Sequence, residues 1–404
     1  MRHEGYLPGS SGYRRIVWSL FAAGLATFTL LYSTQALLPD LRRDFDVSTG
    51  ASTLSVSLAM FGIGAGLLIA GPLSDVVGRT RLIHLSLGAS VVIGFASALA
   101  PTWEALLALR FADGFALAGL PAVATAYLRE ELHPSSQGRA AGLYVGGTAF
   151  GGMSGRLVSG FGAELGGGWR WGIAATVLVG LACAVLVRLA LPASRGFEPA
   201  PGNPRALAAM TRRALSDPAL LALYAIGGCS LGAMVALFNT IGFRLADPPF
   251  ALGIGAASLV FLVYPLGTVS STWFGDLADR HGRRTVIPIG AAVAIVGALL
   301  TLPDVLPLVV VGMGLLVVGF FAVHGIASGW VPLRAHLGGT SAGQAASLYL
   351  FTYYLGSAVF GTASGAAWTR AGWPGSVALS VVLMLLVVVL AVLLIWADGA
   401  VGVF

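Results

Sequence analysis

The stretch GPLSDVVGRTR, residues 71–81, lies between two long apolar runs, and a near-copy, GDLADRHGRRT, occurs at residues 275–285. Only 10% of the 404 residues are charged and 57% are hydrophobic. A typical soluble domain has about 25% charged residues. Because charged residues are so scarce here, two matching charge-dense turns indicate a loop that was duplicated together with the apolar segments around it.

The apolar runs predict membrane-spanning helices. Each is long enough to cross about 30 Å of hydrocarbon at a rise of about 1.5 Å per residue. The ten-residue alternating segments of barrel strands do not occur. Twelve spans are predicted, at residues 16–38, 51–73, 82–100, 103–127, 139–162, 170–190, 219–243, 252–274, 285–302, 307–331, 342–366 and 375–397.

Other sequence matches recur at almost the same offset as the two turns. GRAAGLY at 138–144 returns as GQAASLY at 343–349, and GW at 168–169 returns at 372–373. The chain is therefore predicted to contain two copies of a six-helix unit, residues 1–190 and 219–404, joined by a cytoplasmic linker at 191–218. The predicted fold class is an all-α membrane protein whose twelve transmembrane helices form two pseudo-symmetric six-helix bundles. Two such halves are typical of transporters that move by rocking.

The distribution of arginine predicts the orientation in the membrane. With the N-terminus inside, sixteen arginines fall at cytoplasmic ends and loops and five on the opposite side. By the positive-inside rule both termini are cytoplasmic. The expected location is the inner (plasma) membrane of a bacterium, in contact with the lipid bilayer.

Motifs for catalysis or cofactor binding do not occur in a suitable context. GCSLG at 228–232 has the spacing of a nucleophile elbow, but it lies in an apolar helix and not in a strand–turn–helix. Neither a metal-binding spacing nor a phosphate-binding loop occurs. The sequence predicts a protein that is not an enzyme, with no catalytic residue, metal site, cofactor or nucleic-acid partner.

Three ionisable residues are predicted to lie well inside the membrane: Arg110, Asp113 and Arg156. Each such group costs several kcal/mol and is a candidate functional residue. Arg110 and Asp113 are three positions apart and share a helix face. Arg156 lies at a similar depth, so one cluster is expected to hold all three. A permanent ion pair, a proton carrier at Asp113 and direct contact with substrate remain open as roles.

The repeated turn resembles the loop signature G-x-L-a-D-R-x-G-R-R of the major facilitator superfamily. The second copy carries Gly275, Leu277, Ala278, Asp279, Arg280, Gly282, Arg283 and Arg284, and the first keeps Gly71, Leu73, Asp75, Gly78 and Arg79. The resemblance implies that both loops latch the two halves on the cytoplasmic side. Val76 stands where the family has a base, so the partner of Asp75 is open and the latch is expected to be asymmetric.

The resemblance covers nearly the whole chain. YSTQALLP at 32–39, AYLREE at 126–131, GGMSGR at 151–156 and FNTIGFRLADPPF at 238–250 resemble a branch of YnfM-type inner-membrane exporters near the drug:proton antiporters. This implies the major facilitator fold and a monomer that exports a small-molecule substrate in exchange for protons. A proton-coupled importer and an uncoupled facilitator remain alternatives. Glycines of the fifth span resemble an antiporter motif, although tight packing explains them equally well.

The resemblance also implies that the first, fourth, seventh and tenth helices line the cavity. Their notable polar groups are Tyr32, Gln35, Asn239 and His324, and Tyr264 and Tyr353 are weaker candidates from the eighth and eleventh helices. These six residues are the expected substrate-binding set, with packing as the alternative for each aromatic. His324 is expected either to titrate near neutrality or to be a neutral, hydrogen-bonded histidine. Arg110 corresponds to the family's helix-4 arginine, whereas the position of Asp113 is commonly glutamine.

Overall fold

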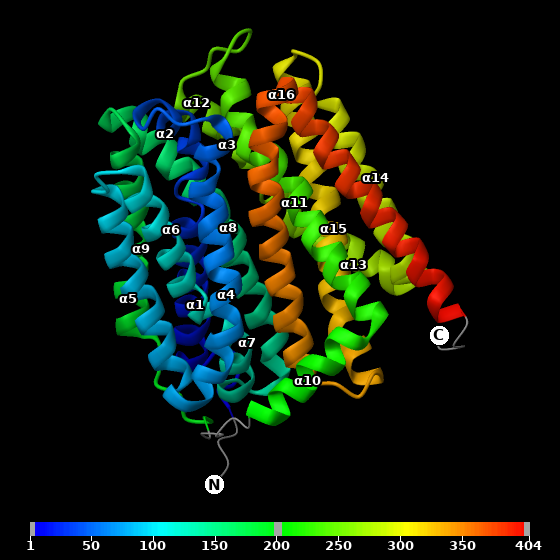
Figure 1. Cartoon of the computed structure of the whole chain (residues 1–404). Coiled ribbons are helices and arrows are strands. Elements are labelled where there is room, and N and C mark those ends of the chain that lie inside the picture. The colour runs from blue at the N-terminus through cyan, green and yellow to red at the C-terminus, as the bar shows by residue number, and fades with distance from the viewer. Residues whose placement is uncertain (1–4, 198–203, 400–404) are drawn as a thin grey trace. The chain divides into compact units, whose positions relative to one another are not determined.

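The computed structural model describes residues 5–197 and 204–399, and these residues are helical apart from turns and one isolated bridge between Tyr6 and Leu132 (Figure 1). The helices before the linker are α1 (Ser11–Leu31), η1 (Gln35–Leu37), α2 (Leu38–Asp44), α3 (Thr49–Ser52), α4 (Leu54–Val77), α5 (Arg79–Ala98), α6 (Trp103–Leu117), α7 (Gly119–Glu131), α8 (Pro134–Gly166) and α9 (Trp169–Ala190). The later helices are α10 (Pro204–Ser216), α11 (Pro218–Ala246), α12 (Ile254–Ser258), η2 (Leu259–Val263), α13 (Leu266–His281), α14 (Arg283–Leu300), α15 (Leu306–Leu337) and α16 (Ala342–Gly399). Residues 1–4, 198–203 and 400–404 of the predicted halves and linker lie outside the described residues.

All twelve predicted spans fall on helices, so the expected all-α membrane fold is confirmed. In the described chain, ten helical segments are long and apolar enough to cross a membrane. The last of them lies within α16, which contains two predicted spans, and the 33-residue α8 contains another. A helix suits these sequences because it satisfies every backbone polar group within the segment, where hydrocarbon offers no partner.

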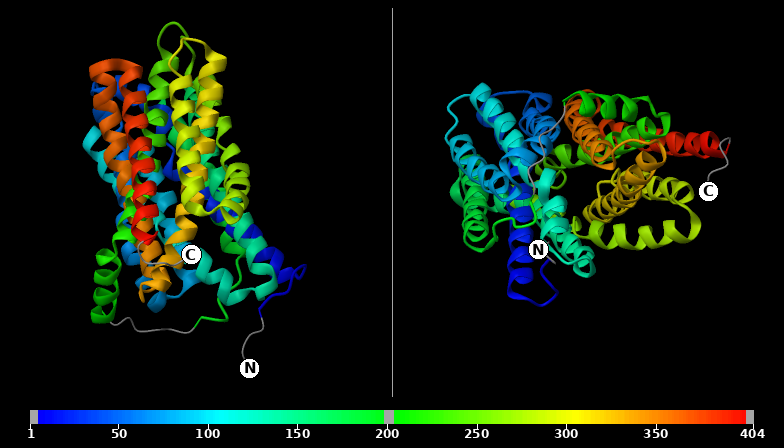
Figure 2. Two further views of the ribbon diagram at one scale, coloured as in Figure 1. Left: turned by 90° about the vertical axis from the view of Figure 1, so that its right-hand side faces the viewer. Right: turned by 90° about the horizontal axis from the view of Figure 1, so that it is seen from below.

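One long ribbon, α16, is two helices joined at a sharp bend. Gly372 has φ 60° and ψ −148°, which is not helical, and Pro374 follows two residues later. The orange and red lengths on either side of this bend run in opposite directions (Figures 1 and 2). They correspond to the two predicted spans at 342–366 and 375–397.

The two copies of the repeated turn have the same backbone geometry. Gly78 is the only residue between α4 and α5, with φ 97° and ψ 145°, and Gly282 is the only residue between α13 and α14, with φ 87° and ψ 139°. Residues with a Cβ rarely adopt these angles, so each one-residue connection depends on glycine. The duplication inferred from sequence therefore extends to the local conformation.

The expected spans 16–38 and 103–127 are each interrupted part-way along. The helix α1 ends at Leu31 and resumes as η1 at Gln35 after a short turn. The boundary between α6 and α7 lies at Ala118, three residues before Pro121. Proline has no N–H to donate to the carbonyl four residues earlier, and its ring crowds that carbonyl. The first interruption positions the candidate site described below.

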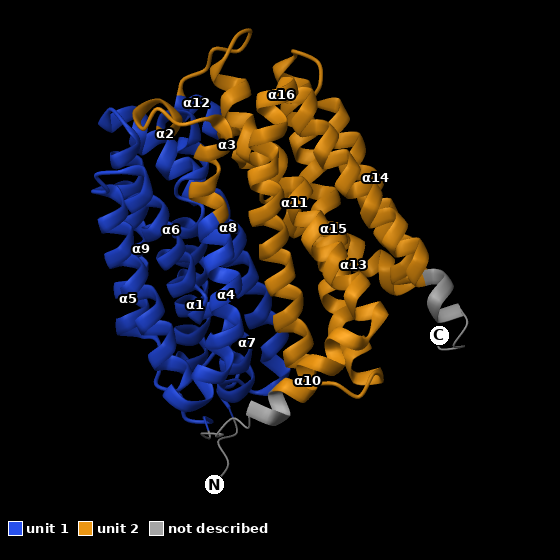
Figure 3. Ribbon diagram, viewed as in Figure 1, with its two compact units in different colours: residues 1–40, 58–202, 254–258 blue, residues 41–57, 203–253, 259–404 orange. Residues whose placement is uncertain are grey.

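The chain forms two compact units (Figure 3). Unit 1 comprises residues 1–40, 58–202 and 254–258, and unit 2 comprises residues 41–57, 203–253 and 259–404. Each unit contains most of one predicted half together with a short segment from the other. The proposed division at 190 and 219 remains a prediction.

In unit 1 the helices α1 and α8 pack closely along a row of glycines. A Cβ at Gly147, Gly151 or Gly155 would overlap the main chain of Phe21, Leu25 or Thr29. The corresponding pair in unit 2 is α11 and α16, where a Cβ at Gly356 would overlap the main chain of Gly228. Gly151 and Gly356 are equivalent in the sequence repeat, so both units use the same close helix approach.

Two short segments belong to the unit of the other half: residues 41–57 to unit 2 and residues 254–258 to unit 1. Their contacts with the longer helices fall at equivalent positions of the repeat. In unit 2, Gly50 of α3 lies against Gly365 of α16, and Thr362 Oγ1 donates to Ser57 Oγ at 2.9 Å. In unit 1, Ser258 of α12 lies against Gly160 of α8. The pair Gly160 and Gly365 is again equivalent in the repeat. Each unit therefore contains the same type of helix contact.

Candidate functional site

Two of the three ionisable residues predicted inside the membrane form a buried ion pair. Arg110 and Asp113 lie on α6, and each is 1% exposed. Arg110 Nη1 donates to Asp113 Oδ2 at 2.7 Å. The other carboxylate oxygen, Oδ1, makes no hydrogen bond of standard geometry within the described residues, and the Ser90 hydroxyl lies beside the carboxylate.

Arg110 also holds the end of α1. Its Nη2 donates to the Leu31 carbonyl at 2.6 Å, and Nη1 donates to the Leu30 carbonyl at 3.3 Å. The last carbonyls of a helix have no partner within the helix and carry its partial negative charge. The guanidinium of Arg110 donates hydrogen bonds to these carbonyls and carries the opposite charge. This explains why α1 can end within its apolar segment.

Arg156 of α8 contacts the residues that follow this break. Its Nε donates to Gln35 Oε1 at 2.5 Å, its Cζ lies 3.9 Å from the centroid of the Tyr32 ring, and its Nη1 donates to the Gly152 carbonyl. Arg156 is fully buried, and Tyr32 and Gln35 are nearly so. A cation over an aromatic face is stabilised most where water is excluded.

The structure thus brings five predicted site residues together around the end of α1, and we call this group the α1 cluster: Arg110, Asp113, Arg156, Tyr32 and Gln35. The two arginines contact adjacent stretches of one broken helix, Leu30–Leu31 and Tyr32–Gln35. A change of charge at Asp113 would therefore reach the backbone of α1 through a single side chain.

The candidates of unit 2 form an aromatic group around His324. A hydrogen bond of 2.9 Å joins His324 Nδ1 to Tyr349 Oη. The His324 ring stacks on Phe320 at 5.8 Å and lies 4.5 Å from the centroid of Tyr353. His324 therefore has a hydrogen-bond partner on α16, and its expected protonation state remains a prediction.

The remaining two candidates of unit 2 are Tyr264, in the turn between η2 and α13, and Asn239 of α11. Tyr264 packs edge-on against Phe321 at 5.4 Å, and Asn239 Nδ2 donates to the Gly361 carbonyl at 3.4 Å. Both side chains are buried. Tyr264 thereby contacts α15, and Asn239 connects α11 to α16. Both residues therefore contribute to helix packing.

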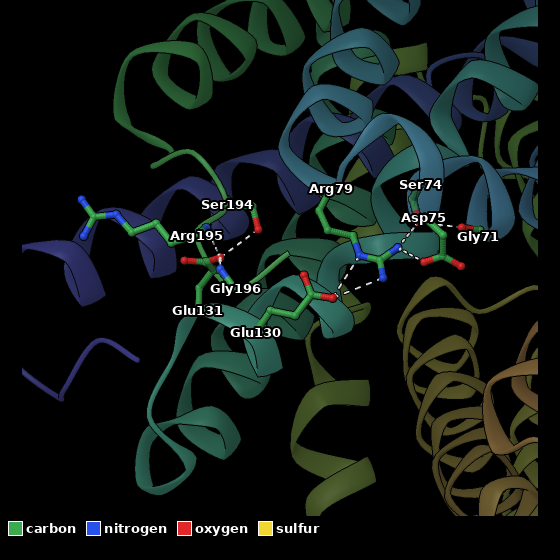
Figure 4. Close-up of polar contacts among 9 residues, drawn as sticks. All are labelled: Gly71, Ser74, Asp75, Arg79, Glu130, Glu131, Ser194, Arg195 and Gly196. Carbon is green, nitrogen blue, oxygen red and sulfur yellow. Dashed lines mark hydrogen bonds and ion pairs between the residues drawn. The ribbon is translucent and has the colours of Figure 1, made fainter. Parts of the chain in front are cut away.

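The first copy of the repeated turn is tied into unit 1 by an ion-pair network (Figure 4). Arg79 Nη1 lies 2.7 Å from Asp75 Oδ1 and donates also to Ser74 Oγ. Arg79 Nε and Nη2 both reach Glu130 Oε1 at 3.2 Å. The Ser74 hydroxyl donates in turn to the Gly71 carbonyl at 2.6 Å. Asp75 therefore has its partner within the turn, at the arginine four residues later.

Beside this network, Glu131 anchors the start of the linker (Figure 4). Its Oε1 accepts hydrogen bonds from Ser194 Oγ at 2.8 Å, Arg195 N at 2.6 Å and Gly196 N at 2.9 Å. The Glu131 side chain is fully buried. Since Glu130 and Glu131 are adjacent on α7, one helix end connects the linker to the first turn.

The second copy of the turn has a more open environment. Asp279, Arg280 and Gly282 are not buried, and within the described residues Asp279 forms no ion pair. Arg284 Cζ lies 5.8 Å from the centroid of the Trp330 ring. A Cβ at Gly275 or Gly71 would meet nothing within 4 Å, so neither glycine is required by packing. The two loops share their backbone but differ in their side-chain partners.

Sequence reasoning does not identify three residues that the structure connects to these sites: Tyr349, Glu130 and Glu131. Tyr349 ends the repeated GQAASLY, and the two glutamates end AYLREE. Their positions in motifs were visible in the sequence. Their partners were not, because His324, Arg79 and the linker are distant in the chain.

A chain of buried apolar helices in two similar units, with charged residues at a broken helix, is a multi-pass membrane transporter. It belongs to the Major Facilitator Superfamily, whose sequence profile matches residues 20–273. The chain is 39% identical over 392 residues to the uncharacterized MFS-type transporter YybF of Bacillus subtilis, with 97% of this chain and 94% of that protein covered. It is also 39% identical over 382 residues to the inner membrane transport protein YnfM of Escherichia coli K12, with 94% and 91% covered.

Solved structures agree on the fold. The bacterial homolog of the human lysosomal transporter Spinster, in its inward-facing and occupied conformation, matches with a TM-score of 0.75 at 15% identity, covering 97% of this chain and 98% of that one. A point mutant of the nucleoside transporter NupG matches with a TM-score of 0.69 at 17% identity, covering 96% and 100%. Transporters of this family bind small-molecule substrates within a lipid bilayer.

Proposed function

We propose that this transporter is a proton-coupled exporter of a small organic compound that works by alternating access. The observation that carries the proposal is the buried Arg110–Asp113 pair at the end of α1. A coupling group must change charge during the cycle, and a carboxylate with one paired oxygen, Oδ2, and one without a hydrogen bond of standard geometry, Oδ1, can accept a proton at the latter.

Protonation of Asp113 would change what holds Arg110. The neutral carboxyl attracts the guanidinium less, which leaves the Leu30 and Leu31 carbonyls as its main partners. Because these carbonyls end α1, the proton is coupled to the position of this helix end. The next residues, Tyr32 and Gln35, are candidate substrate contacts and already touch Arg156. One short path therefore links the proton site to the expected substrate site.

The aromatic group around His324 in unit 2 supports an organic substrate. His324, Tyr349, Tyr353 and Phe320 offer ring faces together with polar groups. Such surfaces bind planar or partly apolar molecules, with the polar atoms fixing their orientation. Asn239 and Tyr264 complete the proposed substrate set.

The two repeated turns act as cytoplasmic latches in this proposal. Gly71, Asp75, Gly78 and Arg79 form the first, and Gly275, Asp279, Arg280, Gly282, Arg283 and Arg284 form the second. We further propose a monomer in a bacterial inner membrane with both termini in the cytoplasm, following the bias of arginine toward the linker side.

An uncoupled facilitator is the second candidate, and one observation favours it. Arg110 binds main-chain carbonyls as well as Asp113, as a purely structural pair would. A proton-coupled importer is also compatible with these residues, because only the direction of net substrate flux would differ.

The proposal is tested first in cells that lack their own exporters. A panel of toxic organic compounds is compared between cells carrying the wild type, Asp113→Asn and an empty vector. The proposal expects lower accumulation and higher tolerance for at least one compound with the wild type only. Asp113→Asn keeps the size of the side chain and an oxygen for Arg110, so equal export by this variant would exclude Asp113 as the proton carrier.

A further inference from the structure

A pocket of about 510 Å³ lies at the linker end of α5 and α9 in unit 1. Arg81, His84 and Leu85 line it from α5, Arg188 lines it from α9, and Leu191 closes it where the linker begins. Arg81, His84 and Leu85 share one face of α5, since residues three and four apart are neighbours on a helix. The pocket is separate from both the α1 cluster and the ion-pair network of Arg79.

The charges of this pocket are all of one sign. Arg81 and Arg188 are exposed, and within the described residues neither forms an ion pair or a hydrogen bond through its side chain. Arg188 is close enough to His84 to act on it electrostatically. Among the described residues, no acidic side chain lines the pocket. Two guanidinium groups that line one pocket, with no acidic partner among the described residues, suit an anionic ligand.

The surroundings of the pocket are apolar and face outward. Leu85, which lines the pocket, is 63% exposed, and Val185, three residues before Arg188 on the same face of α9, is 49% exposed. These residues belong to segments long and apolar enough to cross a membrane, so such exposed side chains contact lipid and not water. An anion that occupies this pocket therefore meets both the guanidinium groups and a hydrocarbon surface.

We propose that this pocket binds an anionic phospholipid. The phosphate of the headgroup lies at Arg81 and Arg188, and an acyl chain lies along Leu85 and Val185. Basic pockets between transmembrane helices at the membrane surface recognise such headgroups, and arginine suits phosphate because it can donate two hydrogen bonds at once. A free phosphate would match the charges and leave the apolar side of the site unused.

The site also connects to the linker. Thr80, which borders the pocket, accepts a hydrogen bond from Ser194 N at 3.1 Å through its Oγ1. Glu131 holds the same serine. A bound headgroup therefore stabilises the end of α5 to which the linker is docked. The proposal does not depend on the direction or coupling of transport.

The test measures lipid binding by the purified full chain in detergent, using native mass spectrometry. Phosphatidylglycerol and phosphatidylcholine are titrated in parallel against the wild type and against Arg81→Gln/Arg188→Gln. We expect the wild type to prefer phosphatidylglycerol, and the double variant to bind it about 30-fold more weakly, since each basic residue near an anionic surface contributes about fivefold. Its affinity for phosphatidylcholine is expected to stay the same.

The matched control is Arg139→Gln/Arg212→Gln, which removes two exposed arginines outside the pocket. It should retain the wild-type preference. Equal binding of the two lipids by the wild type overturns the proposal, and this comparison needs no variant to fold. Equal loss in the two double variants overturns it also, because net charge alone would then explain binding. Displacement of phosphatidylglycerol by millimolar inorganic phosphate would overturn it too, by assigning the pocket to a soluble anion.

Discussion

Arg110 contacts three oxygen atoms at once, Asp113 Oδ2 and the carbonyls of Leu30 and Leu31. The sequence predicts the pairing of Arg110 with Asp113, because the two residues are three apart on one helix face. It does not predict the bonds to α1, whose residues are about eighty positions away and whose helix end is not marked by proline or glycine. Contacts of this kind depend on how helices pack.

The first prediction concerns the stability of this pair. Arg110→Leu should destabilise the protein by about 3–5 kcal/mol, because it leaves the Asp113 charge buried without a partner. Arg110→Leu/Asp113→Leu should recover the part of that loss that comes from the isolated charge, while the Leu30 and Leu31 carbonyls still lack the Arg110 donor. Thermal unfolding in detergent measures both. If the double variant is no more stable than the single one, the buried charge is not the cause of the loss.

The second prediction concerns Tyr349. Tyr349→Phe removes the hydrogen bond to His324 and should cost about 0.5–1.5 kcal/mol of stability. Tyr224→Phe is the matched control, because the buried Tyr224 hydroxyl has no hydrogen-bond partner within the described residues. It should cost nothing or stabilise slightly. Chemical unfolding measures the free energy of unfolding of both variants. Equal losses of stability would mean that the His324–Tyr349 hydrogen bond contributes none.

At the scale of elements, the packing of α8 on α1 explains the glycines of the fifth span. The sequence left two explanations open, an antiporter motif and tight packing. Gly147, Gly151 and Gly155 each lie where a Cβ would overlap the main chain of α1. Close packing is therefore sufficient to require glycine at these three positions.

The third prediction follows from this contact. Gly151→Ala should destabilise the protein by about 1–3 kcal/mol, since an added methyl group pushes α1 and α8 apart. Gly146→Ala on the same helix meets nothing within 4 Å. It should stabilise by about 0.5–1 kcal/mol, because alanine loses less freedom than glycine in a helix. The free energy of unfolding of both variants is measured in the same detergent. The prediction is contradicted if both substitutions raise it or both lower it.

The fourth prediction concerns the two repeated turns. Asp75 is tied to Arg79 and through it to Glu130, whereas Asp279 forms no ion pair with a described residue. Asp75→Asn should slow transport by about fivefold, equivalent to about 1 kcal/mol for a partly exposed pair. Asp279→Asn should slow transport less, because no ion pair with a described residue is lost. Initial rates in proteoliposomes measure this, and a larger effect of Asp279→Asn would contradict the proposed asymmetry.

At the scale of the whole molecule, the sequence is sufficient to predict the helices and the repeat. Long apolar runs have few alternatives in a membrane, and the matches at one offset are independent of any structure. Two features could not be predicted from the sequence: the break of α1 at Leu31 and the docking of residues 194–196 on Glu131. Both depend on side chains far along the chain, which satisfy backbone groups that a local pattern cannot assign.

The fold alone is compatible with export, import and uncoupled diffusion, since architecture does not fix the direction of flux. Coupling is a property of particular groups. One proton that crosses 100 mV contributes about 2.3 kcal/mol, enough for a roughly 50-fold substrate gradient. The proposed mechanism assigns this role to Asp113 because its carboxylate is buried and connected to the end of α1.

The most direct measurement is proton flux in proteoliposomes loaded with a pH-sensitive dye, for a compound that the wild type exports. Adding a substrate gradient should move protons in the opposite direction through the wild type. Asp113→Asn should exchange labelled for unlabelled substrate but move no protons, because its amide does not titrate. Substrate-driven proton flux through Asp113→Asn at the wild-type rate would contradict the proposed coupling, as would substrate transport by the wild type without any proton flux.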